Sequence, residues 1–507
     1  MAELNHDPLA NDGVSCTLCH QITPENLGSA SSYSGHFIIK SDKILYGPYT
    51  NSDTTLMPAI IGYRAAYGPH VNQSELCATC HTLFTATVDY QGKVVGYFPE
   101  QTPYLEWKNS SYPSQNIQCQ DCHMPKLYDP IKISGMGSFP YRSPFWLHTF
   151  VGGNAYMQQI FKDNISAIGA TAEPEHFDST KARTEFMLQE KSIDLSLTTT
   201  IIDDFLEAKV TIKNLAGHKL PTGIPLRRMW VHLQVEKVGS GIVFESGEWD
   251  GSGRINDYDK GYEPHYQIIT SDDQVQVYEA VFADVEHQVT HTLLRAAEFV
   301  KDNRIPPVGF TSSSASYDST GIYGEAINDP DFNKSDNSEG TGSDIITYKI
   351  VIEPNASYRI IAAICHQSIK PELVDHLREI NETEISTFVA MYDSLPNIPF
   401  IIKTVTSEVA TGVLNAVHKP LTYSLEQNYP NPFNSKTIIR YSLARPSFVT
   451  LKVYNPLGQE IISLVNESKL AGSYSVEFDA NNIPSGIYFY KLSAGSYEEI
   501  RKMVLLR

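Results

Sequence analysis

The sequence lacks long apolar runs and is poor in positive charge, and both absences exclude classes of protein. No apolar stretch of about 18 residues or more occurs, whereas a membrane-spanning helix needs about 20, so we expect no membrane span. Lys and Arg total 39 against 58 Asp and Glu, a formal net charge of −19. An acidic chain disfavours nucleic acid as a partner. No G-x-G-x-x-G or P-loop pattern indicates a nucleotide cofactor.

Cysteine is also scarce, and its spacing is informative. Six of the seven cysteines belong to three copies of a C-x-x-C-H motif. The copies are Cys16, Cys19, His20; Cys77, Cys80, His81; and Cys119, Cys122, His123. This spacing is typical of covalent haem attachment, in which two thiols add to the haem vinyl groups and the histidine ligates the iron from the proximal side. We therefore expect three covalently attached haem c groups, with His20, His81 and His123 as iron ligands.

Two other uses of paired cysteines stay open, namely disulfides and a structural zinc site. Neither requires a histidine after every pair, so haem attachment is the favoured interpretation. The remaining thiol, Cys365, lies in the apolar run IIAAIC. We expect it to be a buried strand residue.

The sixth ligand of each iron must come from elsewhere in the chain. Histidine and methionine both serve in this position, and the abundance of histidine favours bis-histidine coordination. The candidate distal ligands, each beside aromatic residues or Gly and Pro turns, are His36, His70, His148 and His218. Met57, Met136 and Met157 remain alternatives, His265 is a weaker candidate, and His6 would suit a haem outside this chain.

The chain divides by composition and periodicity into successive parts. Residues 1–153 show little periodicity and cannot build a core from their own side chains, so we expect a trihaem domain of loops and short helices around the porphyrins. Residues 154–193 have a helical pattern and are expected to form a linker. Residues 194–402 contain alternating strand patterns at 206–212 and 229–235 and further strand-like runs at 273–282 and 344–352, which predict a β-sandwich domain.

Two details of the predicted sandwich can be checked directly. The segment HTLLRAAEFVKDNR, residues 291–304, predicts a helix. Residues 317–344 form a polar segment whose Asp318, Asp329, Asp331 and Asp336 would suit Ca²⁺, although a solvated loop is the favoured interpretation.

The end of the chain predicts a separate all-β module. Residues 403–423 suit a linker, because small and polar residues surround a proline there. From 424 to 507, strand patterns at TIIRYSL, VTLKVYN, YSVEFD and IYFYKL alternate with turns. The module has neither histidine nor cysteine, so we expect a small Ig-like domain without redox chemistry.

Two resemblances fit this division. NYPNPFNSKTIIRYSL, PLGQEI, IPSGIYFYKL and the final RKMVLLR resemble the C-terminal sorting domain of type IX secretion substrates. That resemblance implies export across the outer membrane to the cell surface or the exterior, with the type IX secretion machinery as a partner. An adhesive or carbohydrate-binding sandwich is the alternative.

GVSCTLCHQI, SELCATCHTLFT and IQCQDCHMP resemble multihaem cytochromes of the cytochrome c-552/4 family. NLAGHKLPTGIPLRR and YEPHYQIITSDDQVQVYE are similar to a module fused to such cytochromes. In that setting His218 is implied to be a distal haem ligand. Tetrahaem members of the family have one attachment motif more than this chain.

The expected function is electron transfer through bis-histidine haems at or beyond the cell surface. Redox proteins, extracellular electron acceptors and further copies of the chain are the expected partners. The alternative is a multihaem enzyme that acts on a small nitrogen or sulfur compound at an open haem iron. The first residues, MAELNHDPLANDG, lack both the basic and the apolar segments of a signal peptide, so we expect a processed or truncated start, with a further haem segment upstream if truncated.

Overall fold

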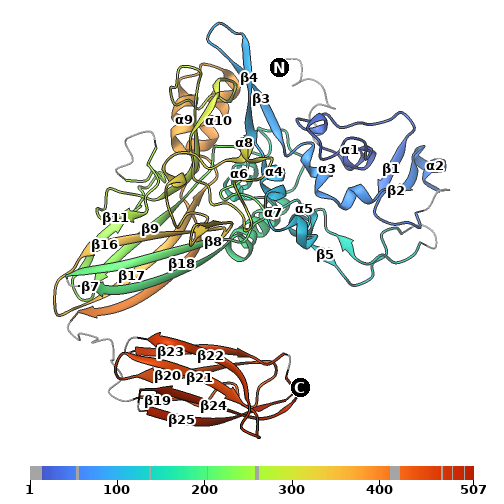
Figure 1. Cartoon of the computed structure of the whole chain (residues 1–507). Helices are drawn as coiled ribbons and strands as arrows, with labels where there is room; N and C mark the ends of the chain where they lie inside the picture. The colour runs from blue at the N-terminus through green and yellow to red at the C-terminus, as the bar shows by residue number, and fades with distance from the viewer. Residues whose placement is uncertain are drawn as a thin grey trace. The chain divides into compact units, whose positions relative to one another are not determined.

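A computed structural model describes most of the chain (Figure 1). The described residues are 14–52, 56–135, 139–202, 204–256, 262–411, 423–469, 472–481, 483–495 and 497–506. They fold mostly into strands of several sheets, with short helices between them. Two compact units are formed, Met1–Val409 and Ala410–Arg507. The expectation of a multidomain, mostly β protein is confirmed.

The N-terminal part of the first unit consists of short elements and loops. Its helices are α1 (Cys16–Gln21), α2 (Leu56–Ile61), α3 (Ser74–Ala78), α4 (Pro103–Lys108) and α5 (Cys119–His123). Its strands are β1 (Ile44–Gly47), β2 (Arg64–Tyr67), β3 (Leu83–Val88), β4 (Val94–Gln101), β5 (Lys126–Leu127) and β6 (Phe145–Trp146). One small apolar cluster joins Tyr33, Ala78, Tyr104, Leu105 and Trp107. So small a cluster gives this part little core of its own.

This N-terminal part packs directly on the sandwich that follows it. Phe98 of β4 is buried and contacts Phe282 and Phe299, with ring centres 5.6 and 4.6 Å away. The hydroxyl of Thr87 in β3 donates a hydrogen bond of 2.5 Å to the carbonyl of Ala296. The two regions therefore share buried contacts within one compact unit.

Residues 154–193, expected as a helical linker, contain α6 (Ala155–Asp163) and α7 (Pro174–Met187), with the last turn continuing as η5 (Leu188–Ser192). The side chain of Asn154 caps α6 by accepting the N–H of Met157 (3.1 Å). Pro174 begins α7, where its missing N–H costs no helical hydrogen bond.

The sandwich consists of two facing sheets (Figure 1). One has the order β13-β12-β9-β17-β18, with β10 paired to β9, and the other has the order β11-β16-β8-β7. The strands are β7 (Ile193–Ile202), β8 (Phe205–Asn214), β9 (Arg228–Lys237), β10 (Gly241–Ser246), β11 (Ile268–Ile269), β12 (Val277–Ala283), β13 (Glu298–Asp302), β16 (Ser343–Val351), β17 (Ala356–Gln367) and β18 (Phe400–Thr411). Helices α9 (Pro371–Arg378) and α10 (Thr383–Asp393) belong to the segment that connects β17 to β18 along the chain.

The two sheets share one core because their strands alternate as the sequence predicts. In β8 the alternate residues Leu206, Ala208, Val210 and Ile212 are fully buried. Met229, Val231, Leu233 and Val235 of β9 belong to the same apolar cluster. The strands predicted at 206–212 and 229–235 are therefore confirmed.

Three expectations for residues 194–423 differ from the structure. Residues 291–304 form a short turn, η6 (Leu293–Arg295), and then β13, because pairing with β12 overrides the helical pattern. The segment 317–344 is not a plain loop, because it contains α8 (Tyr317–Thr320), η7 (Glu325–Ile327) and the hairpin of β14 (Lys334–Ser335) and β15 (Ser338–Glu339). The residues 403–411 expected to begin the linker belong to β18.

The second unit is a smaller sandwich. One sheet has the order β19-β20-β23 and the other the order β22-β21-β24-β25. The strands are β19 (Ser424–Leu425), β20 (Lys436–Leu443), β21 (Ser447–Tyr454), β22 (Glu460–Lys469), β23 (Gly472–Asp479), β24 (Gly486–Ala494) and β25 (Tyr497–Leu505). The strands that the sequence predicts here are confirmed. Among the described residues, no helix is both long and apolar enough to cross a membrane.

Candidate functional site

Each of the three C-x-x-C-H motifs lies on or directly after a short helix. The first and third motifs occupy α1 and α5, and the second begins in α3. The turn after α3 continues the pattern, because the N–H of His81 bonds to the carbonyl of Cys77 at 2.9 Å. One helical turn thus carries two thiols and one imidazole in every copy. All seven cysteines are free thiols.

Two of the motif histidines face a distal candidate that the sequence had singled out. The ring centres of His20 and His148 are 6.1 Å apart, and their ring planes differ by 30°. The ring centres of His123 and His218 are 6.2 Å apart, with planes that differ by 20°. The structure therefore brings together two pairs, each of one motif histidine and one distal candidate.

These separations match the space that one iron needs. A metal–imidazole bond is about 2 Å long and the ring centre lies roughly 1 Å beyond the nitrogen, so two rings bound on opposite sides of one iron have centres about 6 Å apart. The donor set of each pair thus fits a six-coordinate haem iron.

The four rings of the two pairs are anchored in the same way. Each Nδ1 donates to a backbone carbonyl, which fixes the tautomer and leaves Nε2 free. The acceptors are Tyr46 for His20 (2.6 Å), Val151 for His123 (2.5 Å), Trp146 for His148 (2.9 Å) and Lys219 for His218 (3.1 Å). Metal-ligating histidines usually donate their second N–H in this manner.

His218 reaches this position from the sandwich rather than from the N-terminal part. It follows β8 in the turn NLAGHKL and is half-buried. Burial, together with the neighbouring His123, lowers the pKa of His218 to about 4. The ring is therefore neutral at pH 7, which is the form that binds metal.

The third motif histidine and the other two distal candidates are arranged differently. Burial lowers the pKa of His81, and within the described residues no ring contact joins it to another histidine. His36 donates its Nδ1 proton to the carbonyl of Tyr33 (2.6 Å), so its Nε2 is free. His70 is buried and donates from Nε2 to the carbonyl of Ile22 (2.9 Å). The roles of His36 and His70 stay predictions, and His6 and Met136 lie outside the described residues.

The thiols of the three motifs converge in space. The thiols of Cys77 and Cys119 are close enough to act on each other, which raises the pKa of Cys77 and lowers that of Cys119. The charge of Cys19 acts on both Cys77 and Cys80 and raises their pKa. The second motif therefore lies between the first and the third.

A link between α3 and α5 was missed from the sequence. The hydroxyl of Ser74 donates to the side-chain carbonyl of Gln118 (2.9 Å) and accepts the N–H of Cys119 (3.0 Å). The side chains of Gln118 and Asp121 form a reciprocal cap at the start of α5. Polar capping residues just before a cysteine pair are a signal that points to this link.

The zinc and disulfide alternatives find no support in this geometry. A tetrahedral zinc site needs four ligand atoms around one ion. Within the part of the chain that the structure describes, the compact group of potential metal ligands is His265, Asp329 and Asp344, and none of the motif residues belongs to it. The six motif cysteines form no disulfide.

The group of His265, Asp329 and Asp344 is buried in the sandwich and is better explained as a hydrogen-bonded cluster. The Nδ1 of His265 accepts from the side-chain amides of Gln276 (2.8 Å) and Asn303 (3.1 Å). Both amide oxygens are fixed by backbone N–H donors, so neither amide can flip. Nε2 of His265 must then carry the proton, which it donates to Asp329 (3.1 Å), and a protonated nitrogen cannot bind a metal.

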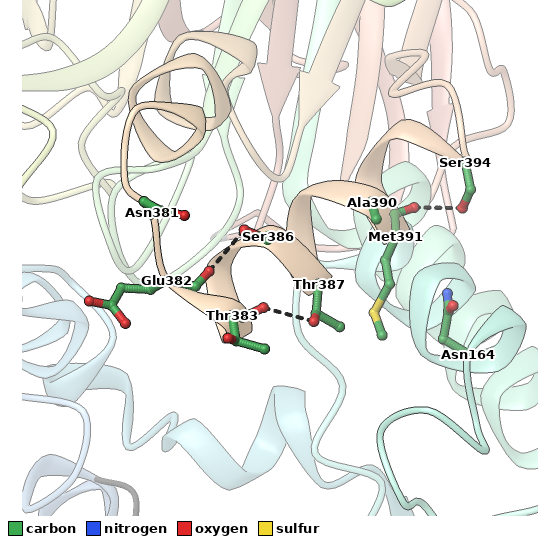
Figure 2. Close-up of a pocket in the computed structure, with 9 residues that line it drawn as sticks. All are labelled: Asn164, Asn381, Glu382, Thr383, Ser386, Thr387, Ala390, Met391 and Ser394. Atoms are coloured by element: carbon green, nitrogen blue, oxygen red, sulfur yellow. Dashed lines mark hydrogen bonds between the residues drawn. The ribbon is translucent and has the colours of Figure 1, made fainter.

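A groove of about 820 Å³ runs along the exposed face of α10 (Figure 2). The hydroxyls of Ser386 and Thr387 donate to carbonyls of their own helix, at 2.9 and 2.8 Å. The groove is lined by Asn164, Asn381, Glu382, Thr383, Ser386, Thr387, Ala390, Met391 and Ser394. They include neither thiol nor imidazole, so this groove offers no redox chemistry.

Comparison with known proteins identifies the second unit. Residues 427–506 match the family model described as a secretion system C-terminal sorting domain. The protein is therefore exported to the cell surface or beyond, and the domain implies an interaction with the type IX secretion machinery. The type IX sorting resemblance of the sequence is confirmed.

A comparison with curated proteins finds no match. The chain is similar to a penta-heme cytochrome c552 from Thermochromatium tepidum, with 16% identity and a TM-score of 0.46 over 80% of this chain and 79% of that one. It is also similar to PorZ, a surface component of the type IX secretion system of Porphyromonas gingivalis, with 15% identity and a TM-score of 0.13 over 19% of this chain and 13% of that one. At these TM-scores neither similarity establishes a shared fold.

Proposed function

We propose that the protein is an exported multihaem c-type cytochrome that transfers electrons through three covalently attached haems. The observation that carries the proposal is the pair of imidazole arrangements, His20 with His148 and His123 with His218, whose ring centres are 6.1 and 6.2 Å apart. Each would hold one iron on both sides. The thiols of the three motifs would hold the porphyrins through thioether bonds, and bound haem supplies one-electron redox chemistry.

The convergence of the motifs supports electron transfer along the chain. Because α3 and α5 are joined through Ser74 and the Cys77 and Cys119 thiols act on each other, porphyrins attached to them would lie close together. Cys19 acts on Cys80, which brings the first motif next to the second. The expected order is therefore the haem of His20, then that of His81, then that of His123. Close edges favour rapid electron steps.

The partners follow from the location of the protein. An exported carrier would exchange electrons with other redox proteins, with acceptors outside the cell or with further copies of the chain. The net charge of −19 favours cationic docking surfaces over anionic ones.

A second candidate is a redox enzyme that acts on a small nitrogen or sulfur compound. The observation in its favour concerns His81. Among the described residues no imidazole ring contacts His81. An iron with one free axial position would bind substrate there.

Low-temperature EPR of the pure oxidised protein tests both candidates. The carrier predicts low-spin ferric signals only. A high-spin signal from one of the three irons would support the enzyme instead and overturn the carrier. A protein without ferric haem signals would overturn both.

A further inference from the structure

The turn that bears His218 is clamped from outside the sandwich. Tyr112 donates from its hydroxyl to the carbonyl of Leu215 (2.6 Å), on one side of the histidine. The carboxylate of Glu106 in α4 accepts the N–H of Lys219 (2.9 Å), on the other side. Side chains from the N-terminal part therefore hold the turn just before and just after His218.

Glu106 also belongs to a buried ionic network. Its Oε1 lies 3.1 Å from the guanidinium of Arg304, which binds both oxygens of Asp302 at 2.9 and 2.7 Å. The Lys219 ammonium binds Asp302 at 2.8 Å and the carbonyl of Gly321 at 2.7 Å. All four charged side chains are buried. Two carboxylates balance two cations, and such a network is stable only while every charge keeps its partner.

The network is close enough to act on the ligand itself. The carboxylate of Glu106 accepts the N–H of Lys219, the residue directly after His218, at 2.9 Å. Without Glu106, two cations would face one carboxylate beside this ring. A positive excess next to an axial ligand stabilises the reduced iron.

We propose that Glu106 is a positioning residue for the haem of His123, and this inference rests on the proposed function. Its carboxylate fixes the His218 turn on α4 through the N–H of Lys219. Its charge also balances Arg304 and so lowers the midpoint potential of that one haem. The two roles are separable, because an amide keeps the hydrogen bond and loses the charge.

Glu106→Gln and Glu106→Ala, made in the full haem-loaded chain, separate the roles. Glu106→Gln should stay fully low-spin and shift the midpoint potential of one haem upward. Glu106→Ala removes both the hydrogen bond and the charge. It should therefore also shift that midpoint potential upward, and it should add a high-spin signal from one iron. If Glu106→Gln and Glu106→Ala have the same midpoint potentials and the same spectra as each other, the inference is overturned.

Glu279→Gln is the matched control. Glu279 is also a buried carboxylate, but it pairs with Lys301 and Lys370 in a different network. Its replacement should leave all haem potentials unchanged, and a shift equal to that of Glu106→Gln would show a general effect of lost buried charge and overturn the inference.

A milder variant covers the case in which the Glu106 variants do not fold. Tyr112→Phe removes only the bond to Leu215 and should alter the g-values of one low-spin haem, whereas an unchanged spectrum would count against the clamp. The spectrum of the wild-type protein distinguishes a failure of the proposed function from a failure of the inference on Glu106. If it lacks low-spin haem signals, the proposed function itself fails, and if only the variants behave unexpectedly, the inference on Glu106 fails alone.

Discussion

His218→Ala is the substitution that most directly tests whether the sandwich contributes to the proposed redox site. His218 is half-buried, its Nδ1 proton is bound to the Lys219 carbonyl, and its ring centre lies 6.2 Å from that of His123. Alanine removes the free nitrogen from one of the three expected irons and leaves the other two untouched. We expect the integrated low-spin EPR signal to fall by one haem out of three, with a matching high-spin signal.

Added imidazole should reverse the change, because truncation of a half-buried side chain leaves a cavity of the shape that was removed. His232→Ala is the control: that histidine lies on β9 of the same sandwich and binds Glu245 at 2.9 Å. It should leave the haem spectra unchanged. An unaltered spectrum in His218→Ala would refute the reasoning, as would loss of all three haems together.

Three further predictions concern the turn, the core and the sorting domain. In Gly217→Ala the new Cβ would lie 3.1 Å from Cδ1 of Trp107, so we expect a loss of about 1 kcal/mol in the free energy of unfolding by urea; an unchanged midpoint would contradict this. Burial lowers the pKa of His366 to about 3. As the pH falls below about 6.5, the unfolded chain therefore takes up a proton at this residue before the folded chain does. The free energy of unfolding should drop by about 2 kcal/mol between pH 6.5 and 5 as a result. His366→Gln should reduce that drop, and an equal slope in both proteins would contradict the assignment. Deletion of residues 424–507 should leave the haem absorption unchanged and abolish export by a type IX-secreting host, since the two compact units have separate cores; export of the truncated chain, or its loss of haem, would contradict this.

The sequence predicted the parts of the structure that depend on local patterns. Alternation at Leu206, Ala208 and Val210 was enough to predict β8, because one face of the strand is buried. The segment from Glu298 to Asp302 was predicted as helix because its apolar residues fit both periods. Hydrogen bonding to β12 determines that the segment forms a strand, and a local sequence pattern does not contain this tertiary contact.

The candidate site shows the same limit. The C-x-x-C-H spacing was enough to propose the thiols and motif histidines as haem-binding residues, because that pattern is local, and their role stays a prediction. It did not tell which distal histidine faces which motif, because His148 and His218 approach through tertiary packing. Glu106 carried no signal at all, because its partners Lys219 and Arg304 are far away along the chain.

Covalent haem is the central claim, and intact mass measurement of the denatured, acid–acetone-extracted protein tests it most directly. Thioether bonds survive this extraction, whereas non-covalent haem and zinc do not. The account predicts a mass equal to the polypeptide plus three haem groups. A mass equal to that of the bare polypeptide would contradict it.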